Sequence, residues 1–400
     1  MPSGPFIPIP RRRFGRTELD MPVFSCGGMR YQHTWNDQPH HEIPAESHAN
    51  VAACIRTSVD YGINHIETAR GYGTSEVQLG TVFKEFPRES LIIQTKIGPK
   101  DSAKDFFATF ETCMQNLQLE YVDLLAIHGI NTHELLDKSR HQGSLAAASI
   151  LKEQGRVRHI GFSTHGPTDA IVETIETGLF DYVNLHWYYV NEVNWPAIEA
   201  ARRQDMGVFI ISPNDKGGKL YEPTEKLKRL CAPLTPMQFN DLWCLCRDDV
   251  HTLSLGAAKA TDFREHMEGL ASWDNRHALT AEIAGRIRAE MEAQLGADWY
   301  ANWAEGLPRW EDVPGGVNIW EIVRLWNYAT ALDMVEFGKM RYNLLGQGDH
   351  WFPGKNAADF DEVEVLRCLH GYRFADRIPE ILRDAHALFS DAPRKRLSES

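Results

Sequence analysis

The chain has 400 residues and a formal net charge of −13, with 43% hydrophobic and 24% charged residues. These proportions are typical of a soluble globular protein, and the acidic balance excludes nucleic-acid binding through a general basic surface. No run of about 18 apolar residues is present, so no membrane span is expected. The start, Met1-Pro-Ser-Gly-Pro, lacks the apolar core of a signal peptide.

The seven cysteines form an odd set without repeated close spacing. This favours reduced thiols over a disulfide framework and predicts a cytoplasmic protein. We expect neither a nucleic-acid nor a membrane partner. The sequence leaves open whether the protein forms a homo-oligomer.

The first predicted element is a short hairpin from Arg11 to Pro22, interrupted by Gly15. Short apolar segments then alternate with longer amphipathic ones. The apolar segments predict eight strands, at residues 23–26, 64–69, 91–97, 121–128, 157–163, 182–186, 207–212 and 250–255. Each is followed by a predicted helix, at residues 47–61, 75–85, 102–117, 145–154, 168–177, 196–204, 235–247 and 261–270.

This alternation predicts an α/β protein with a parallel sheet that helices cover. Eight such units over about 250 residues favour a closed (β/α)8 TIM barrel. A doubly wound open sheet is the alternative, but the turn after the first strand lacks the Gly-x-Gly-x-x-Gly fingerprint of that fold.

After residue 271 the strands stop and only helices are predicted, at residues 277–294, 319–333, 335–345 and 378–389. Seven of the eleven tryptophans lie in this part, which favours a packed region over a disordered tail. We therefore predict a barrel domain of residues 1–271 and a helical C-terminal extension of residues 272–400. The last residues, 393–400, are expected to be loose and solvated.

Polar side chains follow the predicted strands at the ends where barrel enzymes carry their chemistry. In chain order they include Glu67, with Tyr72 in the loop behind it, then Lys96 and His128. A lysine cation stabilises a phenolate, a carboxylate holds the lysine, and a histidine hydrogen-bonds a carbonyl oxygen. Each residue taken singly has a structural alternative as a packing or ion-pair residue. Their coincidence on consecutive strand ends favours a site that protonates a carbonyl oxygen while hydride reaches its carbon.

Four segments resemble the aldo-keto reductase family: Arg12 to Leu19, Thr68 to Glu76, Thr95-Lys96 and Asp123 to His128. The resemblance covers about residues 11 to 270. It implies a (β/α)8 barrel that reduces aldehydes or ketones with NADPH and without a metal. In this reading Tyr72 is the proton donor, Lys96 lowers its pKa and His128 orients the carbonyl. The fourth residue of the family's set is an aspartate, and this chain has Glu67, which adds a methylene.

The resemblance also implies cofactor-binding positions in the loops after the strands: Met29, Arg30, Ser163, Thr164, Asn184, Ser212, Pro213, Asn214, Gly256, Lys259 and Asp262. Ser163 and Thr164 match the pair that holds the carboxamide. Ile211 replaces the aromatic residue that stacks on the nicotinamide. Ser212-Pro213-Asn214 matches the family's pyrophosphate loop, and Gly256 to Lys259 resembles its adenosine-phosphate loop. In that second loop Lys259 is the candidate for the 2′-phosphate, so NADP is favoured over NAD.

The helical tail resembles a subgroup of the family that carries an iron–sulfur cluster, through Met340-Arg-Tyr-Asn, His350-Trp-Phe-Pro-Gly354 and Ile378-Pro-Glu. Cys368 is the one cysteine after Cys246, so four thiolates are not available and no cluster is expected.

Two functions stay open. One is an NADP-dependent oxidoreductase. The other is a nucleotide-binding barrel that Glu67 has weakened as a catalyst and that has a regulatory or interaction role. Trp187, Tyr188 and Tyr189 either line a substrate site or pack.

Overall fold

The computed structural model describes residues 8–392, so the predicted loose end at 393–400 lies outside the described residues. The described chain divides into two compact units, one of residues 8–217 and 240–277 and one of residues 218–239 and 278–392. These units assign the segment 218–239 to the helical part, whereas the sequence placed it in the barrel. The domain boundary after residue 271 stays a prediction.

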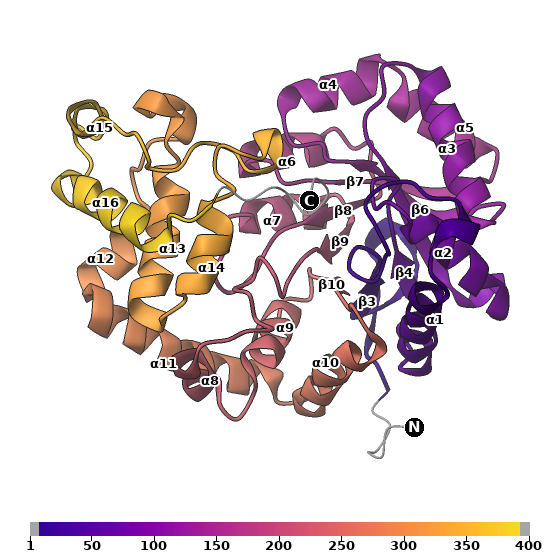
Figure 1. Ribbon diagram of the computed structural model, residues 1–400, viewed down its shortest axis with the longest axis horizontal. Coiled ribbons are helices and arrows are strands. Elements are labelled where there is room, and N and C mark those ends of the chain that lie inside the picture. Colours follow the sequence, from indigo (N-terminus) through magenta and orange to yellow (C-terminus); the bar gives the residue numbers. More distant parts are fainter. Residues whose placement is uncertain (1–7, 393–400) are drawn as a thin grey trace. The chain divides into compact units, whose positions relative to one another are not determined.

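The first unit contains a closed barrel of eight parallel strands, which confirms the predicted (β/α)8 fold (Figure 1). In barrel order the strands are β3 (Phe24–Gly27), β4 (His65–Glu67), β5 (Ile92–Ile97), β6 (Val122–His128), β7 (Val157–Ser163), β8 (Tyr182–Leu185), β9 (Gly207–Ile210) and β10 (Thr252–Leu255), which pairs back with β3. All six residues of β5 are buried, as expected for a strand that is covered on both faces.

A hairpin of β1 (Arg11–Arg13) and β2 (Asp20–Pro22) packs into the apolar end of the barrel interior, and the predicted hairpin is confirmed. Its Phe14 and Met21 join a buried cluster with Tyr182 and other strand residues. Phe14 reaches this place because β9 begins with a glycine. A Cβ at Gly207 would lie 2.6 Å from the Phe14 ring.

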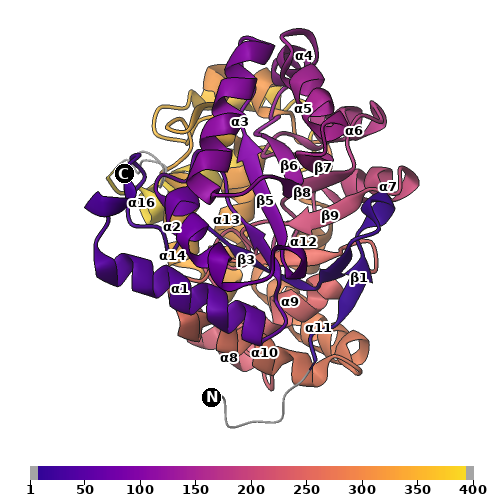
Figure 2. The ribbon, with the colours of Figure 1, turned by 90° about the vertical axis from the view of Figure 1, so that its right-hand side faces the viewer.

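The helices of the first unit follow the predicted strand-to-helix alternation. They are α1 (Ala45–Asp60), α2 (Ser75–Val82), α3 (Ala103–Leu117), α4 (His133–His141), α5 (Ser144–Glu153), α6 (Thr168–Glu176), α7 (Trp195–Arg203), residues 240–245 of α9 (Pro236–Leu245) and α10 (Phe263–Gly269). Figure 2 shows α3 beside β5, which it contacts, and α3 buries Phe106, Phe110 and Cys113 at helical spacing. Helix α4 was not predicted, because it is mostly polar and buries only Leu136 and Ser139.

The second unit is helical. Its helices are α8 (Glu225–Cys231), α11 (Arg276–Leu295), α12 (Ala297–Asn302), α13 (Ile319–Leu332), α14 (Val335–Tyr342), α15 (Glu362–Cys368) and α16 (Ile378–Phe389). Helix α13 packs against α14 and α16, and Gly338 of α14 leaves room for the ring of Phe389. The short helices α8, α12 and α15 were not predicted. Among the described residues, no helix combines the length and apolar character needed to cross a bilayer.

Candidate active site

The ends of β4, β5 and β6 bring three of the predicted site residues to one rim of the barrel. Glu67 ends β4 and His128 ends β6, while Lys96 lies one residue before the end of β5. Thr95 faces outward, where its hydroxyl donates to Glu76 of α2 at 2.6 Å. Because side chains alternate along a strand, Lys96 therefore faces the barrel interior.

Glu67 and Lys96 form a buried ion pair, with 4% and 1% of each residue exposed. The ammonium donates to Oε2 of Glu67 and, at 2.9 Å, to the carbonyl oxygen of Thr68. The other carboxylate oxygen, Oε1, accepts a hydrogen bond from Ser254 Oγ at 3.1 Å. Burial alone lowers the pKa of Lys96, but the negative charge of Glu67 and the contacts with Glu67 and Tyr72 outweigh it and raise that pKa, so the lysine is a cation. The longer glutamate thus reaches the lysine.

Tyr72 completes the set. Its phenol oxygen lies 3.5 Å from Lys96 Nζ, which is long for a hydrogen bond but close for an electrostatic contact. Burial raises the pKa of Tyr72, the Lys96 cation lowers it, and the Glu67 charge adds to the rise, so the net pKa is above the ordinary value. At neutral pH the phenol therefore holds its proton.

Two aromatic side chains hold the Tyr72 ring edge to face. The centroid of His128 lies 5.8 Å away and that of Trp35 lies 6.2 Å away, both nearly perpendicular to the phenol. Trp35 comes from the loop after β3, which Thr74 anchors through its amide to the Thr34 carbonyl at 3.1 Å. Gly73, the residue after Tyr72, has a φ of 51°, and a Cβ there would lie 2.6 Å from the Trp35 backbone. The turn that presents Tyr72 thus depends on a glycine.

His65 and Ser25 are polar residues of the barrel interior near the Glu67–Lys96 ion pair. His65 Nδ1 and Ser25 Oγ share a hydrogen bond of 2.6 Å. Burial and the nearby Lys96 cation lower the pKa of His65 to about 3, so its imidazole is neutral at physiological pH. Lys96 therefore has no competing histidine cation at this position.

The predicted carboxamide site is built from neighbouring residues of β7 and β8. Ser163 pairs in register with Asn184, and both are buried. Ser163 Oγ accepts from the Gly129 amide at 3.1 Å, and Thr164 Oγ1 accepts from the Gly166 amide at 3.0 Å. Both amide atoms of Asn184 lack a protein partner among the described residues. A buried amide that still has a donor and an acceptor available suits the carboxamide of a nicotinamide ring.

The predicted pyrophosphate loop is anchored from several sides. Ser212 has a φ of 54°, and the Pro213 carbonyl accepts from Asn240 Nδ2 at 3.3 Å. Asn214 Nδ2 lies 3.2 Å from His266 Nε2, and the other ring nitrogen of that buried histidine is hydrogen-bonded to a carboxylate.

The loop after β3 meets the pyrophosphate loop through an ion pair. Arg30 donates to Asp215 at 2.8 Å, and its stem runs past Gly256. Met29, just before it, is half-buried. These positions of the resemblance thus lie along one side of the barrel rim.

The predicted adenosine-phosphate loop differs from the expectation in one respect. The carboxylate of Asp262 accepts from the backbone amides of Ala258 and Lys259, at 2.9 and 3.2 Å. A carboxylate therefore occupies the amide donors at which an anion would be expected to bind. The Lys259 side chain is the positive group that the resemblance assigns to this phosphate site.

Three further polar residues gather at the ends of β7, β8 and β9. Lys216 donates to His165 Nδ1 at 2.9 Å and to His186 Nε2 at 3.1 Å. No spacing along the chain indicates this cluster, since its members come from three loops.

Trp187 and Tyr188 are packing residues. Both are buried, and Trp187 stacks on Trp243 with 4.4 Å between ring centroids. The Tyr188 hydroxyl donates to the Ile211 carbonyl. Of the two interpretations of this aromatic run, substrate lining or packing, the packing interpretation fits Trp187 and Tyr188.

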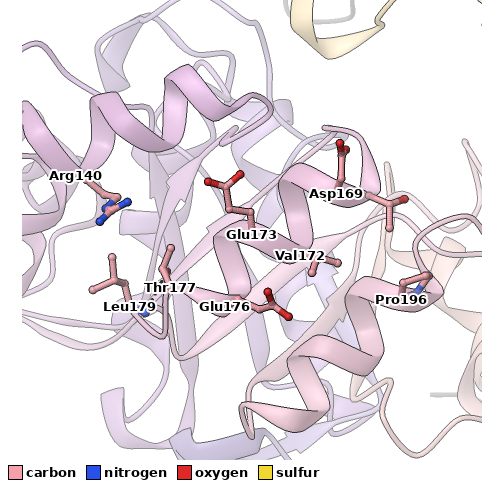
Figure 3. A pocket seen from close by; sticks show the side chains of 9 residues that line it. Arg140, Asp169, Val172, Glu173, Glu176, Thr177, Leu179 and Pro196 are labelled. Carbon is pink, nitrogen blue, oxygen red and sulfur yellow. Dashed lines mark hydrogen bonds between the residues drawn. The ribbon is translucent and has the colours of Figure 1, made fainter. Parts of the chain in front are cut away.

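A cavity of about 840 Å³ lies outside the barrel, between α6 and α7, and is lined by Val172, Glu173, Leu179 and Pro196 among others. Figure 3 shows the carboxylates of Glu173 and Glu176 projecting from α6 beside it. A second cavity of about 540 Å³ is lined by Trp35 and Arg70. None of the four predicted catalytic residues lines the first cavity.

Residues 24–217 match the model of the Aldo/keto reductase family. An aldo-keto reductase of Mycolicibacterium smegmatis is 30% identical over 146 residues, which cover 36% of this chain and 50% of the relative. L-glyceraldehyde 3-phosphate reductase of Escherichia coli is 24% identical over 330 residues, covering 68% and 90%. The chain spans about half the length of most of the first curated relatives that it matches.

A solved structure of an aldo-keto reductase from Bacillus halodurans, in its holo form, shares the fold of this chain. Its TM-score is 0.56 at 18% identity, and the match covers 68% of this chain and 96% of the other.

Proposed function

This chain belongs to the aldo-keto reductase family, and on that premise we propose that it reduces an aldehyde or ketone by hydride transfer from NADPH, with Tyr72 as the proton donor. One observation carries the proposal. The Tyr72 phenol lies 3.5 Å from the ammonium of Lys96, which is itself paired with Glu67 in the barrel interior.

The chemistry of the set follows from its charges. Tyr72 holds its proton at neutral pH because burial raises its pKa. When a carbonyl oxygen beside it gains negative charge, the phenol donates its proton, and the Lys96 cation stabilises the phenolate that remains. Glu67 keeps that cation in place. His128 packs against the same ring and is positioned to orient the carbonyl oxygen.

The residues near the rim fit a nicotinamide dinucleotide at one end. Asn184 and Ser163 offer the donor and acceptor groups that a carboxamide requires. Ile211 offers an apolar contact in place of an aromatic stack. The bound cofactor supplies the hydride. At the adenosine end, the Lys259 side chain offers a cation to a 2′-phosphate, so NADPH is the cofactor of this proposal, and the nearby Asp262 carboxylate limits the discrimination against NADH.

The alternative, a nucleotide-binding barrel without catalysis, rests on the assumption that glutamate spoils the site. The ion pair between Glu67 and Lys96 speaks against that assumption. The reductase is therefore the function that the geometry supports best.

The test is NADPH oxidation by the purified protein with a panel of aldehydes and ketones. Tyr72→Phe should abolish turnover while NADPH still binds, as measured by quenching of protein fluorescence. Tyr182→Phe is the matched control, because Tyr182 is also buried in the barrel and its hydroxyl lacks a protein partner among the described residues. Undiminished turnover in Tyr72→Phe would refute the proton-donor role.

A further inference from the structure

Glu67 has a second hydrogen-bond partner that comes from the far end of the barrel sequence. We propose that Ser254, with the clearance that Gly27 provides, is a positioning residue that fits a glutamate into the catalytic set where the family has an aspartate. The inference rests on the proposed function and deepens it. It names two residues outside the catalytic four, Ser254 and Gly27, that allow Glu67 to take the place of the aspartate.

The strand order places these residues together. Strand β3 lies between β10 and β4 in the closed barrel. Along it, Ser25 pairs with Ser254 of β10, and Gly27 pairs with Glu67 of β4. The hydrogen bond from Ser254 Oγ to Glu67 Oε1, at 3.1 Å, therefore spans β3 on its interior side.

The bond passes where a side chain at position 27 would stand. A Cβ at Gly27 would lie 2.7 Å from Ser254 Oγ and 3.2 Å from Glu67 Oε1. Both are closer than a carbon atom normally approaches an oxygen, and the serine hydroxyl would have to rotate away from the carboxylate. Glycine at this position is thus a condition for the contact.

The need for the contact follows from the length of glutamate. Compared with aspartate, glutamate has one more rotatable bond, and its carboxylate samples more positions. Lys96 binds Oε2 and Ser254 binds Oε1, so the two donors together hold the carboxylate in one orientation. This orientation in turn holds the Lys96 ammonium beside Tyr72. Ser254 contacts neither the phenol nor a reacting atom, so it acts through Glu67.

The proposal predicts that the effect of Ser254 depends on the residue at position 67. An aspartate that pairs with Lys96 is one methylene shorter and does not reach Ser254. Removing the serine hydroxyl should therefore matter in the native background and not beside Glu67→Asp. Such a difference between backgrounds is the signature of a direct interaction between two residues.

The experiment compares the native protein, Ser254→Ala, Glu67→Asp and the double variant. Two readouts are taken: kcat and KM for carbonyl reduction, and solvent exchange of the Lys96 ammonium by NMR, identified by its loss in Lys96→Met. In the native background Ser254→Ala should lower kcat about tenfold with little change in KM and speed the exchange about tenfold, as expected for a lost hydrogen bond to a charged group. In the Glu67→Asp background both changes should stay below about twofold.

Thr252→Val is the matched control, because Thr252 lies two residues earlier on the same strand and its hydroxyl bonds to Ser25 and not to Glu67. It should leave kcat and ammonium exchange unchanged. Gly27→Ala is a second route to the same effect if Ser254→Ala does not fold, and it should be tolerated better beside Glu67→Asp.

Equal effects of Ser254→Ala in both backgrounds, or no effect on ammonium exchange in either, would overturn the proposal. If the native protein reduces no carbonyl, the proposed function fails, while the exchange measurement still decides the role of Ser254.

Discussion

Replacing Lys96 with methionine should destabilise the barrel, and the cost follows from burial. Lys96 and Glu67 are 1% and 4% exposed, so Lys96→Met leaves a carboxylate in the barrel interior without its cation. Breaking a buried pair from one side costs about 3–5 kcal/mol. For a unit of this size, about 2–4 °C is lost per kcal/mol, so the melting temperature should fall by roughly 6–20 °C.

The companion variants separate this cause from a packing defect. Glu67→Gln added to Lys96→Met removes the stranded charge and should recover most of the loss.

The assay is thermal unfolding followed by calorimetry at pH 7, with the barrel transition assigned separately from that of the helical unit. Lys138→Met is the control, because Lys138 pairs with Asp101 at 2.6 Å on the surface and such pairs contribute at most about 1 kcal/mol. The reasoning is refuted if Lys96→Met costs no more than this control, or if the double variant is as unstable as the single one.

Two further changes test the helical unit and the adenosine end. In the helical unit, Glu321 accepts a hydrogen bond from Arg324 at 2.8 Å and lies 3.5 Å from Arg341. Burial raises the pKa of Glu321, but the two arginines outweigh burial, so the net pKa is lowered. The stabilisation that Glu321 provides should therefore be present above the ordinary carboxyl pKa and be lost as the pH falls through the lowered pKa. Glu321→Gln should lower the free energy of unfolding by about 3 kcal/mol at pH 7, measured by urea unfolding. A variant as stable as the native protein would contradict this. At the adenosine end, Asp262→Asn keeps an acceptor for the amides of Ala258 and Lys259 and removes a negative charge. The affinity for NADPH, measured by calorimetric titration, should therefore rise about fivefold, or about 1 kcal/mol, and the affinity for NADH should stay unchanged as the control. An equal change for both nucleotides would show that Asp262 does not face the 2′-phosphate.

Much of the barrel was predictable because its signals are local. Each strand is a short apolar run and each following helix has a 3.6-residue apolar period, so the eight units can be counted along the chain. The predicted strand at 157–163 and the predicted helix at 378–389 match β7 and α16 in both bounds. The helices that were missed, such as α8 and α15, are seven residues long and bury few side chains, so they leave a weak periodic signal.

The sequence by itself determined the candidate set of four, since strand ends meet at one rim of any parallel barrel and Glu67, Lys96 and His128 stand at such ends. Whether glutamate reaches the lysine was decided only by the tertiary structure. The second partner of Glu67 is Ser254, which is 187 residues away in the chain and becomes a neighbour only when β10 closes the barrel against β3. The same holds for Asp262, whose carboxylate accepts from backbone amides of the loop that the resemblance assigns to the adenosine phosphate. Contacts that depend on barrel closure or on loop conformation leave no periodic trace in the chain, and only the folded protein reveals them.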